Sequence, residues 1–454
     1  MTTRMDERRA TASGSLARRR ALRATPYAAQ AMIWSGAAAV LGLWWSDTGS
    51  VVGAAGWLTG AGRITGLLAG YACAVLLALM ARVPLLDQGV GTDRLARWHA
   101  KGGRYTISLV LAHTLLIIWG YSLTAHATLV GQTGTLVLHY PEMLAATAAF
   151  FLFLGTAVVS ARAARRRLSY ETWHYLHFAT YLAVFLAFGH QLANGADFAT
   201  NPAARYAWYA LYLGVAALLV WFRFLVPVRR SLRHRLRVAE VRPEAAGVVS
   251  VFLTGDRLEE LAVAPGQFFR WRFLAPGLWW TANPYSLSAP AHPRSLRITV
   301  KGVGVHSEAL ARLAPGTKVW AEGPYGGFTA ARGTGRKTLL IGGGVGITPL
   351  RTLFETLPGE VTLMYRVRRR RDLVLRDELD SIAAARGTSV LYSVDEPGDD
   401  SVPLTARALL RAVPDVNDRD VYLCGPPGMT EAAGRALRAA GVPGRRIHHE
   451  SFAF

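Results

Sequence analysis

The stretch RWHAKGGRYTISLVLAHTLLIIW, residues 97–119, decides the fold, because it sets His99 and His113 fourteen residues apart in a largely apolar run. A second stretch, HFATYLAVFLAFGH, residues 177–190, sets His177 and His190 thirteen residues apart. Ionisable side chains are costly in hydrocarbon and usually mark a function there. Histidines packed between helices and bonded to backbone or hydroxyl groups are the simpler interpretation of any single one. Four histidines in this arrangement favour two haems, one above the other, with an imidazole on each side of each iron.

The composition is that of a membrane protein with more than one domain. The chain has 454 residues, 51% of them hydrophobic, and a formal net charge of +21. On a soluble chain this charge would indicate nucleic-acid binding, but here the basic residues adjoin apolar segments, as they do beside membrane spans. The two cysteines, Cys73 and Cys424, are too few for an iron–sulfur cluster and form no disulfide framework. We therefore expect lipid, and no nucleic acid, as a partner.

Six segments are apolar and long enough to cross a bilayer at about twenty residues each, namely residues 27–45, 64–81, 104–124, 142–161, 173–192 and 205–226. Arginines and lysines crowd the tail 1–26, the loops after the second and fourth spans and the exit of the sixth, whereas the alternate loops hold only Arg63 and Arg205. The positive-inside rule then places both termini in the cytoplasm. We expect residues 27–228 to form a six-helix domain in the inner membrane.

The predicted orientation pairs the histidines, since the third and fifth spans run in the same direction. His99 would face His177 at the inner level, and His113 would face His190 at the outer level. Fourteen residues make about 21 Å of helix and nearly four turns, so His99 and His113 share a face. Thirteen residues are not a whole number of helical turns, so in a regular helix His190 would point to a different side from His177. Either a helix distortion or a different approach of the second ring must compensate for this angular offset. His174 would break the matched depth and is assigned to the membrane interface.

Beyond the last span the pattern changes to short alternating runs. Three of them predict strands of a β-barrel domain over residues 233–332, namely Arg235–Val241, Val248–Thr254 and Gln267–Phe273. Further strands alternate with helical stretches, namely Thr338–Ile341, Val361–Arg366, Ser389–Tyr392 and Val421–Cys424. That alternation predicts a doubly wound α/β domain with a parallel sheet over residues 333–454.

Two motifs of the predicted barrel are candidates for a flavin site. In NPYS, residues 283–286, a tyrosine followed by a hydroxyl can cover a flavin ring and bond its N5 edge. In KGVGVHS, residues 301–307, glycines allow close backbone approach, and the final serine begins a predicted helix whose N-terminus favours phosphate. An ordinary strand, turn and helix is the alternative for the second motif. The turn Glu322–Gly326 would form one wall of the same flavin site.

The predicted parallel sheet carries candidates for a nucleotide site. IGGGVGITP, residues 341–349, follows an apolar strand and precedes a helix, so its glycines can approach a dinucleotide pyrophosphate. CGPPGM, residues 424–429, stands at another strand end, where ligands of open α/β sheets gather. Arg366 and Arg368 follow the second strand and could meet a ribose 2′-phosphate. The aromatic end, residues 450–454, could stack on a flavin or could be a frayed tail.

Together and in this order, these residues resemble the ferric reductase and NADPH oxidase superfamily, which are transmembrane bis-haem proteins fused to a ferredoxin–NADP reductase-like flavin module. The histidine spacing, Arg63, Ala81-Arg82-Val83-Pro84 and Arg97-Trp98-His99 are similar to its bacterial reductase branch. The resemblance implies that FAD is bound by Asn283, Pro284, Tyr285, Ser286, Lys301, His306 and Ser307. It implies that NADPH is bound by Gly342, Gly343, Gly344, Val345, Gly346, Thr348, Pro349, Arg366, Arg368, Cys424, Gly425, Pro426 and Met429.

The resemblance also implies roles at the reaction centre and on the acceptor side. Tyr285, Ser286 and Cys424 would lie beside the reacting rings, and Phe452, or alternatively Phe454, would cover the flavin until nicotinamide displaces it. Arg63 would lie on the acceptor side. Two positions depart from the family. Asn283 stands where a basic residue is usual, so part of the phosphate contact must come from elsewhere, such as Lys301. Ile117 stands where the animal superoxide-forming members carry a further histidine.

We therefore expect an enzyme that passes electrons from cytosolic NADPH through FAD and two b-type haems to an acceptor outside, with ferric chelates as the first expectation. Two alternatives keep the cofactors, namely superoxide production from oxygen and electron delivery to a periplasmic partner protein. A third is a transporter or sensor whose histidines relay protons and whose soluble half binds nucleotide only as a regulator. Purified protein without haem absorbance would indicate the third.

Overall fold

The computed structural model describes residues 2–46, 51–161, 168, 170–334, 337–396 and 401–451. The chain divides into two compact units. The helical unit comprises residues 26–83 and 94–223, and the sheet unit comprises residues 1–25, 84–93 and 224–454. Each unit has its own core, so each is described by itself.

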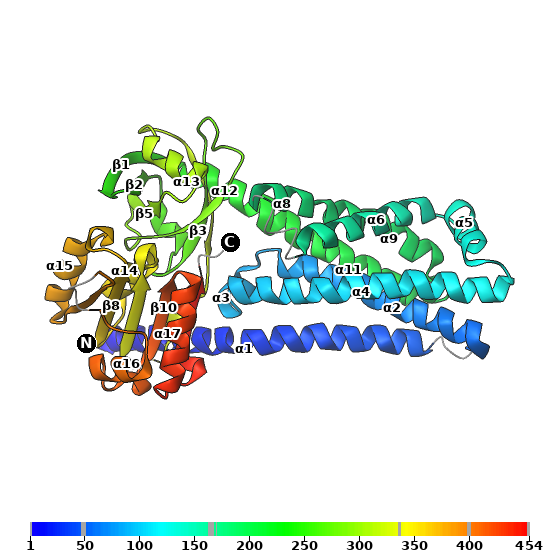
Figure 1. Ribbon diagram of the computed structural model, residues 1–454, viewed down its shortest axis with the longest axis horizontal. Coiled ribbons are helices and arrows are strands. Elements are labelled where there is room, and N and C mark those ends of the chain that lie inside the picture. Colours follow the sequence, from blue (N-terminus) through cyan, green and yellow to red (C-terminus); the bar gives the residue numbers. More distant parts are fainter. Residues whose placement is uncertain are drawn as a thin grey trace. The chain divides into compact units, whose positions relative to one another are not determined.

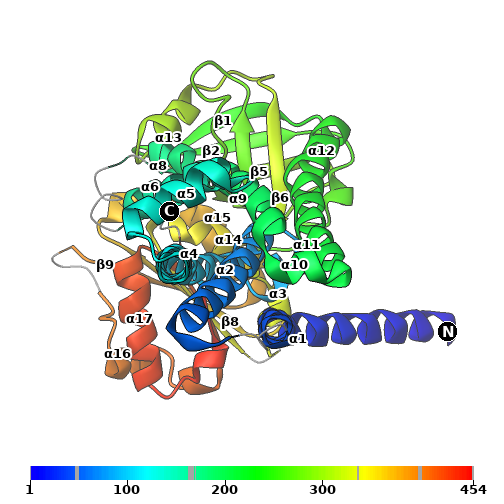
Figure 2. The same ribbon diagram turned by 90° about the vertical axis from the view of Figure 1, so that its right-hand side faces the viewer.

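The helical unit is built from long apolar helices that run side by side (Figure 1; Figure 2). Its elements are α2 Gly53–Leu79, α5 Leu129–His139, α6 Met143–Ser160, α8 Tyr170–His177, α9 Ala179–Asn194, α10 Ala196–Thr200 and α11 Pro202–Val220, with the parts of α1 Thr2–Ser46 and α4 Thr92–Ala125 that begin at Pro26 and Arg94. A π-helical turn, Trp221–Leu225, and α12, Val226–His234, continue α11 into the sheet unit. Within the helical unit α6 packs against α9, and α2 against α11.

Five helical stretches are long and apolar enough to cross a membrane, namely Gly53–Leu79, Thr92–Ala125, Met143–Ser160, Thr172–Asn194 and Pro202–His234. Large apolar side chains on their outward faces, such as Phe151 and Phe185, are exposed. Such surfaces suit lipid chains, which are as apolar as the side chains themselves. The chain is therefore a multi-pass membrane protein.

Two of the predicted spans differ from the helices. The predicted first span, residues 27–45, is helical within α1 but is not one of the five stretches. Gln30, Ser35 and nearby glycines lower its hydropathy. The predicted second span, residues 64–81, begins earlier, at Gly53, so Arg63 lies inside α2 rather than beside its end. A span predicted from hydropathy ends at the first charged residue, here Arg63. In the structure the helix continues past Arg63, because Asp197 forms an ion pair with its side chain.

The first part of the sheet unit contains two antiparallel three-stranded sheets, ordered β1-β2-β5 and β4-β3-β6. The strands are β1 Arg237–Ala245, β2 Val248–Thr254, β3 Phe268–Phe273, β4 Asn283–Ser286, β5 Ser295–Lys301 and β6 Val319–Tyr325. Leu253, Phe269, Trp271 and Ile298 share one core between them. In the described residues the two sheets are joined by isolated bridges, Leu287 to Ile298 and Arg237 to Lys318, and not by continuous ladders, so the closed barrel stays a prediction. Alternating apolar and polar residues predict strands with one buried face, and such strands occur both in a closed barrel and in a pair of open sheets.

The second part of the sheet unit is a five-stranded parallel sheet with the order β11-β10-β7-β8-β9. Its strands are β7 Thr338–Gly343, β8 Val361–Val367, β9 Val390–Val394, β10 Asp420–Gly425 and β11 Ile447–Ser451, and its helices are α14 Ile347–Thr356, α15 Arg376–Arg386, α16 Ala406–Ala412 and α17 Pro427–Ala439. Successive β7 residues, Leu340 and Ile341, enter different cores, so both faces of the sheet are covered.

The topology of this sheet places a ligand crevice. From β7 the chain proceeds to β8 and β9 on one side and then returns to β10 and β11 on the other. The strand order therefore reverses between β7 and β10. In open α/β sheets ligands bind beyond the carboxyl ends of the strands at this reversal. Both glycine-rich motifs of the sequence stand there, at Gly342 and Gly425.

Candidate functional site

The helical unit brings the four predicted histidines into two facing pairs. His99 and His113 both lie on α4, His177 ends α8 and His190 lies on α9. The ring centroids are 6.0 Å apart for His99 and His177, and 5.9 Å apart for His113 and His190. A metal–imidazole bond is about 2 Å long and the centroid lies about 1 Å from the nitrogen, so a metal between two imidazoles separates their centroids by about 6 Å. Both pairs have the separation that a shared metal requires.

An interruption at Phe178 lies between the two histidines of the second stretch. The Phe178 amide is shared between the carbonyls of Tyr175 at 3.1 Å and His174 at 3.2 Å, and the Tyr181 amide donates to the carbonyl of Phe178 at 3.0 Å. These three-residue hydrogen bonds wind the chain more tightly than an α-helix and so change its phase. The thirteen-residue spacing of His177 and His190 is thus accompanied by a helix distortion, one of the two expected alternatives.

Backbone carbonyls of α2 hold the rings that α4 carries. His113 Nδ1 donates to the carbonyl of Gly62 at 2.8 Å, and His99 Nδ1 donates to the carbonyl of Leu76 at 3.2 Å. A carbonyl can only accept, so the proton of each neutral ring lies on Nδ1 and Nε2 keeps its lone pair. This is the arrangement that orients histidine ligands in metal sites. The sequence did not indicate these carbonyls, because backbone acceptors carry no residue signal.

The partner rings are held less regularly. His177 Nδ1 lies 3.4 Å from Ser160 Oγ, and the indole of Trp173 stacks on the His177 ring with centroids 5.1 Å apart. His190 Nδ1 is buried and has no hydrogen-bond partner among the described residues. A buried polar atom without a partner requires an explanation, such as a bound group or water.

Glycines on α2 make room for the His113 ring. A methyl group at Gly66 would lie 2.5 Å from His113 Nδ1, and one at Gly62 would lie 2.8 Å from the side chain of Ile117. Contacts below 3.0 Å require a neighbour to move. The two glycines, four residues apart on one helix face, therefore allow α2 to approach α4 closely enough for its carbonyl to reach the ring.

A cavity of about 380 Å³ inside the helical unit lies beside the second pair, with His113 and His190 among its lining residues. Arg63 lines it too, and its Nη2 lies 2.9 Å from Oδ1 of Asp197, which is 2% exposed. Charges this deeply buried are tolerated when they are paired. Sequence analysis selected Arg63 and missed Asp197, whose signal would have been an acidic residue directly after an apolar span.

In the sheet unit, the predicted flavin residues Tyr285 and Ser286 lie on β4. Phe269 stands opposite Tyr285 and Phe268 opposite Ser286 on β3. Trp271 Nε1 donates to the Tyr285 carbonyl at 2.9 Å, and burial raises the pKa of the Tyr285 hydroxyl. The hydroxyl of Ser286 is buried and finds no hydrogen-bond partner within the described ranges. It is therefore poised for a group that the chain does not itself supply.

His306 and Ser307 lie at the start of α13, Val305–Ala309. His306 Nδ1 is buried and, in the part of the chain described, lacks a hydrogen-bond partner. The Ser307 hydroxyl accepts from the amides of Val303 and Gly304 at 2.9 and 3.1 Å, so it stabilises its own turn. The remaining flavin candidates lie on strands, with Asn283 and Pro284 on β4 and an exposed Lys301 ending β5.

The two glycine motifs meet at the carboxyl ends of β7 and β10, where Gly342 is the ladder neighbour of Cys424. Gly344 has φ +52°, and a methyl group at Gly425 would lie 2.8 Å from the Met429 side chain. Only glycine gives a ligand this close an approach to the backbone. Around these residues stand the other predicted members of the nucleotide site, Gly343, Val345, Gly346, Thr348, Pro349 and Pro426.

The two arginines predicted to meet a 2′-phosphate differ in their surroundings. Arg366 is ion-paired with Asp395 and donates to the carbonyl of Val402 at 2.6 Å. Arg368, one residue beyond the end of β8, is exposed and makes no hydrogen bond or ion pair within the described ranges. Arg368 is therefore the better placed of the two for an added anion. The predicted flavin-covering residues Phe452 and Phe454 lie outside the described residues.

Glu450 joins this edge, and the sequence analysis gave it no role. It is the β11 neighbour of Cys424 in the parallel ladder. Burial, with a smaller contribution from Asp93, raises the pKa of the Glu450 carboxyl, and burial likewise raises the pKa of the Cys424 thiol. Burial therefore favours the protonated form of both groups. The signal that could have found Glu450 is an acidic residue at a strand end on the ligand-binding edge of the sheet.

Comparisons with known proteins cover both units. Residues 65–188 match the model of a ferric reductase like transmembrane component, and residues 340–435 match that of an oxidoreductase NAD-binding domain. The chain is 29% identical over 236 residues to the glycine betaine monooxygenase reductase subunit of Chromohalobacter salexigens, covering 48% of this chain and 64% of that protein. It is 30% identical over 232 residues to the toluate 1,2-dioxygenase electron transfer component of Pseudomonas putida, covering 48% of this chain and 68% of that protein.

Among solved structures, the flavohaem-like FAD/NAD-binding domain of nitric oxide dioxygenase from Vibrio cholerae is 28% identical, with 48% of this chain and 99% of that chain covered and a TM-score of 0.41. The chain spans about two thirds of the length of the curated relatives named above. The two family matches and the curated relatives identify an NAD(P)H-dependent oxidoreductase with transmembrane helices and a FAD- and NAD-binding module. The chain therefore combines a ferric reductase-like transmembrane component with a flavin- and nicotinamide-binding module of the ferredoxin reductase type.

Proposed function

We propose that this enzyme carries electrons from NADPH through FAD and two b-type haems to ferric chelates on the outer face of the inner membrane. The observation that carries the proposal is the pair of equal ring separations, 6.0 Å for His99 and His177 and 5.9 Å for His113 and His190. FAD supplies the conversion of a two-electron hydride into single electrons, and haem supplies one-electron carriers.

The chain's own residues are suited to hold the haems. Two imidazoles leave the remaining positions of an iron open for a macrocycle, which a haem provides. The carbonyls of Gly62 and Leu76 keep His113 and His99 in the tautomer that presents Nε2. Iron with a histidine on both sides has no free position, so we expect the acceptor to take electrons at the edge of the outer-level site. Arg63, which lines the adjoining cavity, is our candidate for the acceptor side.

The sheet unit offers matching groups for FAD and the nucleotide. The unpartnered buried atoms Ser286 Oγ and His306 Nδ1 fall on the two predicted flavin motifs, which supports a bound group there. We assign the nucleotide to the crevice between β7 and β10. Glu450 and Cys424 border it as buried groups whose protonated forms are favoured, and Arg368 is the first candidate for a 2′-phosphate. Preference for NADPH over NADH rests on this residue.

We also propose the finer organisation that the charge pattern predicts. Residues 27–45 of α1 would be a sixth span, both termini and the nucleotide module would lie in the cytoplasm, and residues 1–26, 27–228, 233–332 and 333–454 would be the tail and three domains. The basic residues at the exit of the last span support this orientation. Protease protection of sealed inner-membrane vesicles tests it, since only the reverse orientation would shield the sheet unit in inside-out vesicles.

An acceptor panel tests the proposed reaction. The purified full chain in nanodiscs is supplied with NADPH, and reduction of ferric citrate is followed under anaerobic conditions. We expect reduction without oxygen. If reduction of ferric citrate or cytochrome c occurs only in air and superoxide dismutase abolishes it, oxygen is the acceptor and the ferric assignment is wrong.

Replacing one outer-level histidine separates the two halves of the proposal. His113→Leu should remove one haem and stop reduction of the acceptor, yet leave NADPH-dependent bleaching of the flavin intact. Unchanged haem content in this variant would overturn the ligand assignment.

A further inference from the structure

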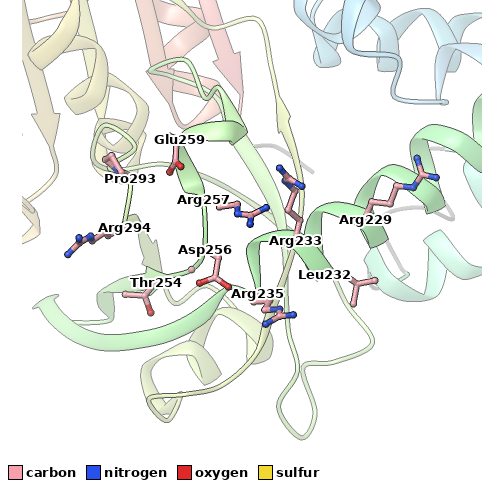
Figure 3. A pocket seen from close by; sticks show the side chains of 11 residues that line it. Arg229, Leu232, Arg233, Arg235, Thr254, Asp256, Arg257, Glu259, Pro293 and Arg294 are labelled. Carbon is pink, nitrogen blue, oxygen red and sulfur yellow. The ribbon is translucent and has the colours of Figure 1, made fainter.

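The sheet unit carries a basic hollow that none of the sites above uses (Figure 3). It measures about 1360 Å³ and is formed by α12, the loop after β2 and the loop before β5. Five arginines line it against two carboxylates, namely Arg229, Arg233, Arg235, Arg257 and Arg294 against Asp256 and Glu259. Thr254, Gly255, Leu232 and Pro293 complete the lining.

The charge of this basic hollow is only partly neutralised by the chain. Arg233 forms an ion pair with Glu260. Arg235, Arg257 and Arg294 are exposed, and in the described part of the chain their side chains make no hydrogen bond or ion pair. In Figure 3 Arg257 extends toward the helix that carries Arg233. Guanidinium groups gathered in this way repel one another, and an anion between them relieves the repulsion.

One wall of the hollow is continuous with a membrane-spanning helix. Pro202–His234 is a single helical stretch of 33 residues that qualifies as a span. At 1.5 Å per residue it is about 50 Å long, whereas the hydrocarbon core is about 30 Å thick. Its last ten or so residues, which include Arg229 and Arg233, therefore reach beyond the hydrocarbon into the headgroup region.

The same helix end has an exposed apolar face. Leu225, Val228 and Leu232 are 40%, 39% and 65% exposed, and their spacing of three and four residues places them on one side. Leu232 also lines the hollow, next to the arginines. Apolar side chains beside arginines at the end of a span are typical of a segment lying in the lipid interface. A soluble acidic protein would match the charge of the hollow, but its binding would not explain the exposed apolar side chains beside it.

We propose that the basic hollow binds the phosphate headgroup of an anionic phospholipid, with its acyl chains along Leu225, Val228 and Leu232. Arg235, Arg257 and Arg294 supply guanidinium groups that form no hydrogen bond or ion pair in the described residues, and α12, which lines the hollow, is the end of the helical stretch that qualifies as a span. The inference concerns lipid selectivity and does not depend on the haems or on the acceptor.

The test uses the delipidated full chain in detergent, titrated by calorimetry with dioctanoyl phosphatidylglycerol, dioctanoyl phosphatidylcholine and glycerol phosphate. The hollow variant is Arg257→Gln with Arg294→Gln. The control is Arg312→Gln with Arg411→Gln, two exposed arginines elsewhere on the sheet unit with the same loss of charge. Thermal unfolding of both variants checks that they fold.

We expect phosphatidylglycerol to bind more tightly than phosphatidylcholine, and the hollow variant to lose roughly 25-fold in affinity for it, because each arginine near an anionic surface is worth about a factor of five. The control pair should keep the preference. The proposal is overturned if the hollow variant keeps it, or if the control loses it equally. The proposal is also overturned if glycerol phosphate binds as tightly as the lipid, because the hollow would then be a site for small anions. It is likewise overturned if an acidic peptide competes for the hollow as well as the lipid does, because the hollow would then be a protein-docking site.

Discussion

Adding one methyl group at Gly66 should selectively disturb the outer-level histidine pair. In Gly66→Ala the new carbon would lie 2.5 Å from His113 Nδ1 and 2.8 Å from its Cε1, whereas ordinary contacts begin at 3.4 Å. The ring must therefore move by about 1 Å, which is half the length of a metal–imidazole bond. The movement also stretches the 2.8 Å hydrogen bond from His113 to the carbonyl of Gly62.

The magnitude follows from these two losses. Overpacking of this kind typically costs about 1–3 kcal/mol, and the hydrogen bond contributes about 1 kcal/mol. A combined loss of about 2–4 kcal/mol weakens retention of the outer-level haem by roughly 30- to 700-fold. The pair His99 and His177 has no contact with Gly66 and should keep its haem, so the haem-to-flavin ratio should fall from two toward one.

The assay is the pyridine haemochrome measurement of haem, set against released flavin, on protein purified from the same cells. Gly155→Ala is the matched control, because a methyl group at Gly155 on α6 meets no described atom within 4 Å. Both haems retained with an unchanged spectrum in Gly66→Ala would refute the reasoning, as would an equal loss in the control.

Further predictions concern the sheet unit. Arg368→Ala should raise the KM for NADPH by roughly 10- to 150-fold and leave that for NADH unchanged, because one charge-assisted contact is worth about 1.5–3 kcal/mol; Arg366→Ala, assayed beside it, should change the two values equally, since its guanidinium is already engaged. Because burial raises the pKa of Glu450, the stability that this carboxyl contributes is fully present below its ordinary pKa and is lost as pH rises through the raised value; Glu450→Gln should therefore flatten the fall in melting temperature as pH rises above the ordinary carboxyl pKa, and an unaltered pH profile would contradict its burial. Glu378→Ala should lower the stability of the sheet unit by about 1–3 kcal/mol in denaturant unfolding, because it leaves the buried Arg297 without its carboxylate partner, whereas Glu378→Gln should lose less.

Much of the helical unit could be predicted from the sequence. The pairing of His99 with His177 needed only the direction of two spans, which loop charges reveal, and the two rings lie 6.0 Å apart. The helix distortion at Phe178 could not be predicted, because no proline or glycine marks it in the sequence. The hydrogen bond from His113 to the Gly62 carbonyl could not be predicted either, because every residue has a backbone carbonyl and the residue type does not show which one is used.

In the sheet unit the strands could be predicted, whereas the closure of the two antiparallel sheets into a barrel stays a prediction. The alternation of apolar and polar residues in β2 and β3 indicates which face of each strand is buried. It does not indicate which strands are neighbours in the sheet. The assignment of Arg366 to a phosphate missed its local partner Asp395, 29 residues away in sequence. Glu450 was overlooked as a site residue because its burial depends on a ladder with Cys424 that only the fold creates.

The account depends on two facing histidine pairs that each hold one haem. The most direct measurement is the reduced-minus-oxidised spectrum of the purified full chain, with haem and flavin quantified in the same sample. We expect the sharp bands of low-spin bis-imidazole haem at two haems per flavin. Colourless protein, or a single haem per flavin, would contradict the central claim.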